Sequence, residues 1–434
     1  MNKKLKYFIK TFGCTYNKNS SNIIEGILLK NGYTSVNNER NTDIIIINSC
    51  IVKINTEAKI LFLLKKLVNN FPDKIFIVCG CMPEVMPKTI TRISPKINLI
   101  GPFFVTKILH VIKEFQENKK PVIMIGKRME NKLNQPKRLK NKLIDIIPIA
   151  QGCVNSCNYC IVKKAMGALR SYSIDSIINS IKNSIQEGAK EIRLTSQDLS
   201  AYGIDLGVNL AQLLKQINYL KGEFRIRLGM MNPSTLLPII DGFLDACNNE
   251  RIYSFFHLPI QSGDNVILEK MNRKYTIKDF LTIYEKIKSK FEIFTLSTDI
   301  ICGYPSETEN NFNNTLRLIE RIAPDIVNIS KYGHRPGTVA SNEKDLNTKI
   351  KKKRSKSLTI LMKSIIKNKY KRLIDKKSSV LFLRRESQNL YWGRTDWYYP
   401  IVFSSNKNVL GKILDLKIKG YEGHRLIGTP IHPQ

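Results

Sequence analysis

Three cysteines, Cys153, Cys157 and Cys160, lie close together in the chain with the spacing C-x3-C-x2-C. They directly follow the apolar stretch 146–150, which places them in a loop after a buried strand. Thiols at this density are typical of metal ligands rather than of structural cysteines. A cubane cluster has four irons, so three cysteines leave one iron open to a substrate or cofactor, much as catalytic zinc sites keep an open position.

A second set of cysteines is dispersed along the chain: Cys14, Cys50 and Cys81 each follow a predicted strand. Because the carboxyl ends of parallel strands meet at one edge of a sheet, we expect these three thiols to converge and to hold a second cluster. One such cysteine alone would usually be an ordinary core residue, but three in equivalent places favour a metal site. The other cysteines are predicted to be core residues, namely Cys79, Cys247 and Cys302.

Polar side chains also follow the later predicted strands. They are Ser196, Gln197, Asp198, Asn232, His257, Gln261, Glu307 and Arg335, with Gly303 among them. Polar groups at strand ends around a central cavity suit the binding of a charged small molecule. His257 by itself could equally be a hydrogen-bonded core residue.

The C-terminal tail combines aromatic and basic residues, among them Tyr391, Trp392, Arg394 and Trp397. Aromatic rings interleaved with basic residues on a small β-barrel can stack on unpaired bases. Some of these rings must instead form the core of the barrel, so we expect about half of them to be available to RNA.

The elements that position these residues alternate between strands and helices over the first 120 residues. Strands are predicted at 6–12, 43–48 and 74–78, with helices at 19–30 and 56–68. This is the βαβ rhythm of a parallel sheet. The basic stretch 127–142 that follows is predicted to be a linker or a solvated loop without a role.

A second βα series runs from residue 143 to 340. Its strands are predicted at 145–150, 191–195, 225–229, 253–258, 294–301 and 325–331. Six units predict a partial (β/α)6 barrel with functional residues on the loops at the C-terminal strand ends. A basic helix at 351–371 and short strands at 379–384, 388–393, 400–403 and 411–419 then predict a small all-β barrel. The fold class is therefore α/β, with divisions at 1–120, 121–142, 143–370 and 371–434.

The 434-residue chain has a formal net charge of +34, with 70 Lys and Arg against 36 Asp and Glu. A general preference for lysine accounts for part of the excess, but a surface this basic predicts a polyanionic partner such as RNA or DNA. We recognise no signal peptide at the N-terminus and no apolar run long enough to span a membrane. We therefore expect a cytoplasmic monomer, in a compartment where thiols stay reduced and clustered cysteines bind metal.

Over its whole length the chain resembles the radical S-adenosylmethionine methylthiotransferases. The resemblance rests on 13–14, 48–50 and 80–81 in an N-terminal domain, on 152–160 in a central radical-SAM domain, and on a TRAM-like tail. Several stretches are most similar to the archaeal and eukaryotic branch, which acts on threonylcarbamoyladenosine in tRNA: 13–17, 194–198, 201–203, 227–233, 257–263, 298–305 and 335–338.

The resemblance implies two 4Fe–4S clusters with different tasks. Cys153, Cys157 and Cys160 would hold the cluster whose open iron chelates S-adenosylmethionine and generates a 5′-deoxyadenosyl radical, which removes the hydrogen at carbon 2 of the target adenine. The dispersed cysteines would hold an auxiliary cluster whose open iron carries sulfur. A second S-adenosylmethionine would methylate that sulfur before its transfer. A sulfur donor and an electron donor are further partners that the reaction requires.

The resemblance also implies roles around the cofactor. Tyr159, Ile301 and Gly303 should lie near its adenine, and Ser196, Gln197 and Asp198 near its amino end. His257 and Gln261 complete the expected cofactor contacts, and Arg335 is expected to contact RNA. Residues 166–171 depart from the Arg-Gly-type sequence of the family, with Arg170 as a substitute, and we expect no membrane anchor at the polar end 431–434.

Other functions remain open at this level. Within the same family the substrate could be isopentenyladenosine in tRNA or an aspartate of a ribosomal protein. A zinc-stabilised RNA-binding protein is an alternative of a different class, but each cysteine set lacks a suitably spaced fourth Cys or His.

Overall fold

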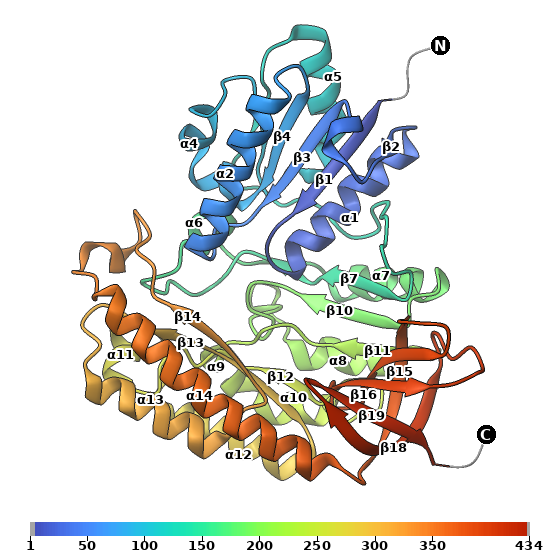
Figure 1. Ribbon diagram of the computed structural model, residues 1–434, viewed down its shortest axis with the longest axis vertical. Coiled ribbons are helices and arrows are strands. Elements are labelled where there is room, and N and C mark those ends of the chain that lie inside the picture. Colours follow the sequence, from blue (N-terminus) through green and yellow to red (C-terminus); the bar gives the residue numbers. More distant parts are fainter. Residues whose placement is uncertain (1–4, 432–434) are drawn as a thin grey trace. The chain divides into compact units, whose positions relative to one another are not determined.

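The computed structural model describes residues 5–431 (Figure 1). Two compact units make up the chain. The first comprises the chain up to Lys140 together with Ile146–Ser156 and Cys160–Arg170; the second comprises Asn141–Asp145, Cys157–Tyr159 and the chain from Ser171 onward. The boundary therefore runs through residues 153–160, which we call the CxxxCxxC loop.

A six-stranded parallel sheet in the order β2-β1-β3-β4-β5-β6 forms the centre of the first unit. The apolar run 44–47 of β3 is fully buried, as expected for a parallel strand covered on both faces. The strands are β1 (Lys6–Thr11), β2 (Thr34–Ser35), β3 (Ile44–Ser49), β4 (Ile75–Gly80), β5 (Asn98–Ile100) and β6 (Ile123–Met124). The predicted strands β1, β3 and β4 are thus confirmed, and the short strands extend the sheet on both sides.

Helices cover both faces of this sheet (Figure 1). Because successive side chains of a strand alternate, Ile45 and Ile47 pack with α2, whereas Ile44 and Ile46 pack with α1 and α5. The helices are α1 (Thr15–Lys30), α2 (Ile54–Asn70), α3 (Cys81–Val85), α4 (Pro87–Thr91), α5 (Ile108–Asn118) and α6 (Val162–Met166). Helix α6 follows the CxxxCxxC loop and belongs to the first unit.

Residues 127–140, which we call the strap, pack against the first unit without forming a helix or strand. Lys132 and Leu133 are buried, and the Arg138 guanidinium lies 3.2 Å from the Glu25 carboxylate. At Gly26 of α1 a Cβ would lie 2.3 Å from the Pro136 carbonyl oxygen, so the helix leaves room only for a hydrogen atom. The strap is therefore a packed part of the unit rather than the linker or solvated loop predicted from its composition.

Two three-stranded sheets follow, in the orders β11-β10-β7 and β12-β13-β14, and all their strands belong to the second unit except β7, which begins in it and ends in the first. The bridges Ile226–Ile252 and Met230–His257 are parallel and link β11 to the region of β12. The strands are β7 (Ile144–Pro148), β10 (Glu191–Thr195), β11 (Arg225–Arg227), β12 (Phe255–His257), β13 (Thr295–Cys302) and β14 (Ile326–Lys331). This order confirms the predicted partial (β/α)6 barrel.

Helices follow the strands of this barrel, and α14 runs along β13 and β14 (Figure 1). They are α7 (Ile174–Gln186), α8 (Leu210–Asn218), α9 (Pro233–Leu236), α10 (Ile240–Cys247), α11 (Asn265–Lys270), α12 (Ile277–Lys290), α13 (Glu309–Ile322) and α14 (Thr348–Leu373). Two short strands, β8 (Ala150–Gln151) and β9 (Arg170–Ser171), flank the CxxxCxxC loop and pair with each other.

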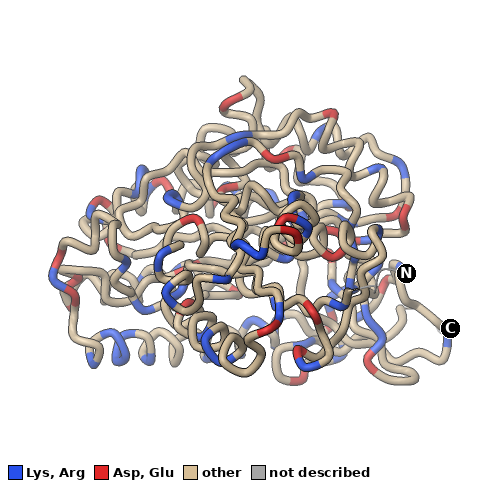
Figure 2. The backbone as a smooth tube through the Cα atoms, turned by 90° about the horizontal axis from the view of Figure 1, so that it is seen from above, with Lys and Arg blue, Asp and Glu red and all other residues tan. Residues whose placement is uncertain are grey.

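The C-terminal strands close into a five-stranded barrel in the order β15-β16-β17-β19-β18. They are β15 (Lys377–Arg385), β16 (Leu390–Thr395), β17 (Pro400–Ser404), β18 (Ile413–Glu422) and β19 (Arg425–Pro430). The small all-β barrel is thereby confirmed. Lys and Arg are spread along the whole described chain (Figure 2), and helix α14 carries no acidic residue. Within residues 5–431 no helix is both long and apolar enough to cross a membrane.

Candidate active site

The dispersed cysteines follow three neighbouring strands of the first sheet. Cys14 is the N-cap of α1 after β1, Cys50 follows β3, and Cys81 is the first residue of α3 after β4. Since β1, β3 and β4 are adjacent and parallel, the three residues lie at the same edge of the sheet, as predicted.

Gly13 and Asn17 bring the loops of Cys14 and Cys50 into contact. Gly13 has a φ of 106°, and a Cβ there would lie 2.7 Å from the Cys50 Cβ. The Asn17 amide donates to the carbonyl oxygens of Phe12 and Ser49, at 2.9 Å each. Gly13 and the Asn17 side chain therefore allow the loop of Cys14 to approach Cys50 this closely.

The surroundings of Cys81 suit a thiolate only when a cation is nearby. Burial raises the pKa of the Cys81 thiol, negative charge on Cys14 and Cys50 raises it further, and Lys132 lowers it. Lys132 is fully buried in the strap, with its Nζ 4.5 Å from the Tyr16 ring centroid and 2.6 Å from the Pro102 carbonyl oxygen. Metal binding would supply the positive charge that stabilises the thiolates.

Three thiols are the number of donors that a four-iron cluster with one open iron takes. Among residues 5–431, no three His, Cys, Asp or Glu side chains converge on one metal-ion position. A zinc ion needs four donors at about 2.0–2.3 Å, whereas a four-iron cluster takes each thiolate on a different iron and tolerates wider spacing.

The cysteines predicted to be core residues are buried. Cys79 of β4, Cys247 of α10 and Cys302 of β13 are at most 2% exposed. Burial raises the pKa of Cys79 and of Cys302 to about 12, so both stay protonated. They behave as small apolar side chains.

The CxxxCxxC loop begins at a glycine that the fold requires. Gly152 has a φ of 78°, and a Cβ there would lie 1.8 Å from the Ala168 carbonyl oxygen. The Cys153 Sγ accepts hydrogen bonds from the backbone and side-chain amides of Asn155, at 3.4 and 3.8 Å. Amide donors of this kind stabilise a thiolate.

Helix α6 packs beside the helix that begins at Cys81, within the first unit. It begins two residues after Cys160, and its Ala165 and Met166 share one hydrophobic core with Cys81 and Met82 of α3. The departure from the family sequence at 166–171 therefore starts with a core residue. Arg170, the suggested substitute, is exposed.

Arg273 of the second unit is a site residue that the sequence analysis missed. Its Nη1 lies 3.3 Å from the Cys157 Sγ, and its Nη2 donates to the Asn232 side chain at 3.0 Å and to the Pro259 carbonyl oxygen at 3.3 Å. Burial lowers the pKa of Arg273, but Tyr159, Tyr275 and Cys157 raise it to a net value above the usual one. A permanent cation thus contacts a predicted cluster ligand. In the sequence, only the position of Asn232 after a predicted strand indicated this part of the site.

Comparison with known proteins identifies the family. Residues 6–101 match the "Uncharacterized protein family UPF0004", and residues 147–319 match the "Radical SAM superfamily". The chain is 39% identical over 98% of its length to a "Probable threonylcarbamoyladenosine tRNA methylthiotransferase" of Pyrococcus horikoshii, all of which it covers. It is 32% identical over 98% of its length to the human "Threonylcarbamoyladenosine tRNA methylthiotransferase", of which it covers 74%. The chain belongs to the threonylcarbamoyladenosine tRNA methylthiotransferase family.

Solved radical S-adenosylmethionine enzymes share the fold of this family member. A methyltransferase, TsrM of Kitasatospora setae, matches with a TM-score of 0.57 at 11% identity, over 78% of this chain and 75% of that one. The cobalamin-dependent enzyme OxsB matches with a TM-score of 0.51 at 12% identity, over 83% of this chain and 56% of that one. At such identities the likeness establishes the fold alone.

Two of the residues that the methylthiotransferase resemblance assigned to the cofactor's adenine lie together. Tyr159 and Ile301 pack on the same hydrophobic core as Tyr304 and Tyr332. At the end of β10, Ser196 Oγ and Gln197 Oε1 are buried and have no hydrogen-bond partner among the described residues. Unpaired buried polar atoms are costly, so these two are suited to a ligand.

Asp198, next in the chain, already has partners within the protein. Its carboxylate accepts from Ser200 Oγ, Thr235 Oγ1 and the Asn232 backbone N–H, at 2.9–3.0 Å. Burial raises its pKa, and these hydrogen bonds lower it. Asp198 thus joins the loops after β10 and β11 and positions its neighbours.

His257 and Gln261 lie at the end of β12 and in the loop after it. The His257 Nε2 lies 3.0 Å from the Asp299 carboxylate, which also accepts from Asn328 at 2.7 Å. Gln261 has a φ of 69°, and its backbone N–H donates to the Asp299 carbonyl oxygen. His257 is therefore a hydrogen-bonded histidine on the sheet face it shares with Asp299.

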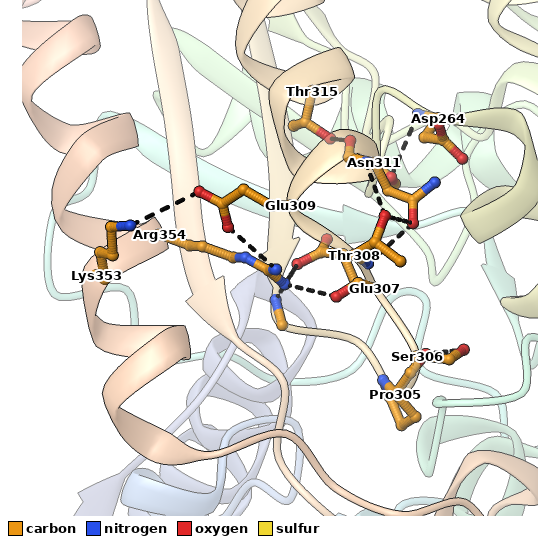
Figure 3. Close-up of polar contacts among 12 residues, drawn as sticks. Asp264, Pro305, Ser306, Glu307, Thr308, Glu309, Asn311, Thr315, Lys353 and Arg354 are labelled. Carbon is orange, nitrogen blue, oxygen red and sulfur yellow. Dashed lines mark hydrogen bonds and ion pairs between the residues drawn. The ribbon is translucent and has the colours of Figure 1, made fainter.

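A buried ion pair holds the loop that contains Gly303 (Figure 3). The Glu307 carboxylate accepts from the Gly303 N–H at 2.8 Å and from the Arg354 Nη1 at 2.6 Å. Gly303 has a φ of 74°, and a Cβ there would lie 2.5 Å from the Lys351 Cγ. The loop after β13 is therefore fixed to α14.

The C-terminal barrel exposes only some of the residues expected to contact RNA. Tyr391 and Trp397 are 1% and 4% exposed and belong to the barrel core. Side chains of β16 alternate between the inside and the outside, so Trp392 and Arg394 lie on the opposite face. Arg335 is buried as well. We correct the expectation accordingly and retain Trp392 and Arg394.

Proposed function

We propose that this chain replaces the hydrogen at carbon 2 of threonylcarbamoyladenosine, at position 37 of tRNA, with a methylthio group. Two three-cysteine sets at strand ends, in a chain that matches threonylcarbamoyladenosine tRNA methylthiotransferases over 98% of its length, carry the proposal. The net charge of +34 suits a tRNA substrate.

The residues present fit two 4Fe–4S clusters and S-adenosylmethionine. Cys153, Cys157 and Cys160 would hold one cluster, and the dispersed cysteines would hold the other, with one iron of each free of protein ligands. When bound, these groups supply the electron, the radical and the sulfur that the substitution requires.

The chain's own side chains position the reacting groups. Arg273 orients Cys157 and adds a positive charge beside it. Ser196 and Gln197 offer unpaired polar atoms to the amino end of the cofactor, and Tyr159 and Ile301 offer an apolar surface to its adenine. Gly303, Gln261 and His257 are held in place by the protein around them.

We assign the auxiliary cluster to residues 1–120, the radical reaction to 143–370 and RNA binding to the TRAM segment 371–434, with 121–142 between the first two. Trp392 suits stacking on a base, because the guanidinium groups of Arg384 and Arg394 lie 5.2 and 4.6 Å from its ring centroid. The protein would act in the cytoplasm as a monomer, with separate proteins as sulfur and electron donors.

The test uses the full chain, reconstituted anaerobically with iron and sulfide. We expect a brown protein with about eight irons from two clusters. Incubated with S-adenosylmethionine, sulfide as the sulfur source, a reductant and tRNA, it should yield 2-methylthio-threonylcarbamoyladenosine, measured by mass spectrometry of the digested nucleosides. Matched reactions contain isopentenyladenosine tRNA or a ribosomal-protein substrate.

A methylthio product from either of those substrates, and none from threonylcarbamoyladenosine tRNA, would contradict the assigned substrate. A colourless, zinc-loaded protein without product would contradict the enzyme assignment and favour a structural RNA-binding role.

A further inference from the structure

Two arginines lie side by side on one face of the barrel sheet. In the parallel pairing of β10 with β11, Arg193 is the direct partner of Arg227, and Glu191 is the partner of Arg225 two pairs earlier. The intervening Ile192 and Ile226 are fully buried and face the other side of the sheet. Like charges directly opposite each other on neighbouring strands destabilise a sheet, so this arrangement calls for a compensating anion.

The nearby carboxylate of Glu191 does not compensate Arg227. One Glu191 oxygen lies 2.6 Å from the Arg193 Nε, and the other accepts from the Tyr253 hydroxyl at 3.1 Å. Within residues 5–431 Arg227 has no ion pair, and its guanidinium lies over the rings of Phe255 and Tyr398, at 4.7 and 5.9 Å. Its hydrogen-bonding capacity is therefore not used by a neighbouring carboxylate.

A third guanidinium comes from the TRAM barrel. Arg394 lies over the ring of Tyr398 at 4.3 Å, donates to the Tyr398 carbonyl oxygen at 2.9 Å, and has a buried Nε without a partner. Burial lowers the pKa of Arg227, and the charges of Arg193 and Arg394 lower it further, against Tyr398 and Glu191, which raise it. Within residues 5–431, Arg193 is thus the only one of these three guanidinium groups that is paired with a carboxylate.

We propose that Arg193, Arg227 and Arg394 form a binding site for an oxyanion of the tRNA substrate, and that this oxyanion is the carboxylate of the threonylcarbamoyl group. The inference rests on the proposed function and names the residues that recognise its substrate. A guanidinium fork matches a carboxylate through two parallel hydrogen bonds. A backbone phosphate has the same chemistry and is the other source that the test distinguishes.

The position of the site in the sheet supports this assignment. Phe255, which contacts Arg227, lies two residues before His257 on β12, so both side chains lie on the same face. His257 is hydrogen-bonded to Asp299 at the end of that face where the strands lead into the predicted cofactor loops. An adenosine held near those loops could extend its carboxylate along the sheet toward Arg227.

Arg227→Gln provides the test, because Arg227 has no carboxylate partner that its loss would leave unpaired. Synthetic anticodon stem-loops with threonylcarbamoyladenosine or plain adenosine at position 37 are titrated against the cluster-loaded full chain. We expect the variant to lose about 10- to 100-fold in affinity for the modified RNA and to keep its affinity for the unmodified RNA. Arg317→Gln, which removes an exposed arginine from α13, is the matched control.

The possible outcomes distinguish a carboxylate ligand, a phosphate ligand and the absence of a site. An equal loss for both RNAs, with the salt dependence of binding reduced by about one ion for each, would support the oxyanion site with a phosphate as its ligand. No change for either RNA would overturn the site. If Arg227→Gln lowers the melting temperature, Arg394→Gln on a separate strand must lose more affinity for the modified RNA than for the unmodified RNA, which Arg394 would also contact beside Trp392. An equal loss for both RNAs, or none, would then overturn the carboxylate site.

The proposed function is tested separately from the oxyanion site. A wild-type protein that does not prefer the modified RNA and forms no methylthio product from it would contradict that function, whatever the arginine variants do. A wild-type protein that makes the product while Arg227→Gln and Arg394→Gln retain full selectivity would contradict only the oxyanion site.

Discussion

Replacing Arg354 with methionine tests whether the buried ion pair stabilises the second unit. The Arg354 and Glu307 side chains are 5% and 1% exposed, with Nη1 and Oε2 2.6 Å apart. Without the arginine, the Gly303 N–H, at 2.8 Å, is the only donor to this carboxylate that remains among residues 5–431. Removing one partner of a buried pair leaves an uncompensated charge, so we expect the free energy of unfolding to fall by about 3–5 kcal/mol.

Urea denaturation followed by tryptophan fluorescence measures this change, because both tryptophans, Trp392 and Trp397, lie in the same unit as the pair. Lys353→Met is the matched control: its Nζ lies 3.8 Å from Glu309, the two side chains are 76% and 57% exposed, and the expected cost is below about 1 kcal/mol. The double variant Arg354→Met/Glu307→Met should regain most of the loss, because no charge remains buried. Equal costs for Arg354→Met and Lys353→Met would refute the reasoning.

The same pair predicts a pH dependence. Burial raises the pKa of Glu307, while the Gly303 N–H and Arg354 lower it, and the net pKa is raised. Loss of Arg354 raises it further. A carboxyl whose pKa is higher in the folded state binds more protons there, so its contribution to stability falls as pH rises from its unfolded pKa through its folded one. The penalty of Arg354→Met should therefore shrink as the pH falls from neutral toward the ordinary pKa of a glutamate, and a penalty that grows instead would contradict this sign.

Three further predictions concern the cysteine sites and the strap. Cys14→Ala should abolish methylthio product and lower the iron content from about eight to about four, while S-adenosylmethionine is still cleaved to 5′-deoxyadenosine; full product formation would exclude the auxiliary site. Arg273→Met should shift the reduction potential of the cluster at Cys157 to more negative values in a spectroscopic titration, because loss of the cation and of its hydrogen bond destabilises the reduced cluster. The potential of Arg273→Lys should lie between those of the wild type and Arg273→Met. Gly26→Val should lower the free energy of unfolding by about 1–3 kcal/mol, because a Cβ at this position would lie 2.3 Å from the Pro136 carbonyl oxygen. An unchanged melting temperature would contradict this prediction and show that the strap moves aside without cost.

The sequence predicted the parts of this fold that depend on short-range patterns. The buried run of β3 and the cysteines after β1, β3 and β4 follow from strand periodicity and from the rule that parallel strands end at one edge. The barrel, too, follows from regular alternation of strands and helices.

Contacts between distant parts of the chain could not be predicted in this way. Arg273 and Cys157 are 116 positions apart, and no local pattern joins them. The composition of the strap suggested solvent exposure, yet its Lys132 is buried because Glu130, Tyr16 and a backbone carbonyl surround the charge. In β16 the sequence shows that alternate side chains face opposite sides. Which set faces the core depends on how the barrel closes, and Tyr391 faces inward.

The common core of α3 and α6 limits how this chain can be divided. A fragment that ends at residue 140 keeps Cys81 but loses the apolar side chains of α6 that cover its helix. A fragment that begins at residue 141 keeps the CxxxCxxC loop but loses the surface on which α6 packs. No single cut separates the two cysteine sets into independently folding halves, so recombination between relatives should preserve both sets together rather than exchange one of them.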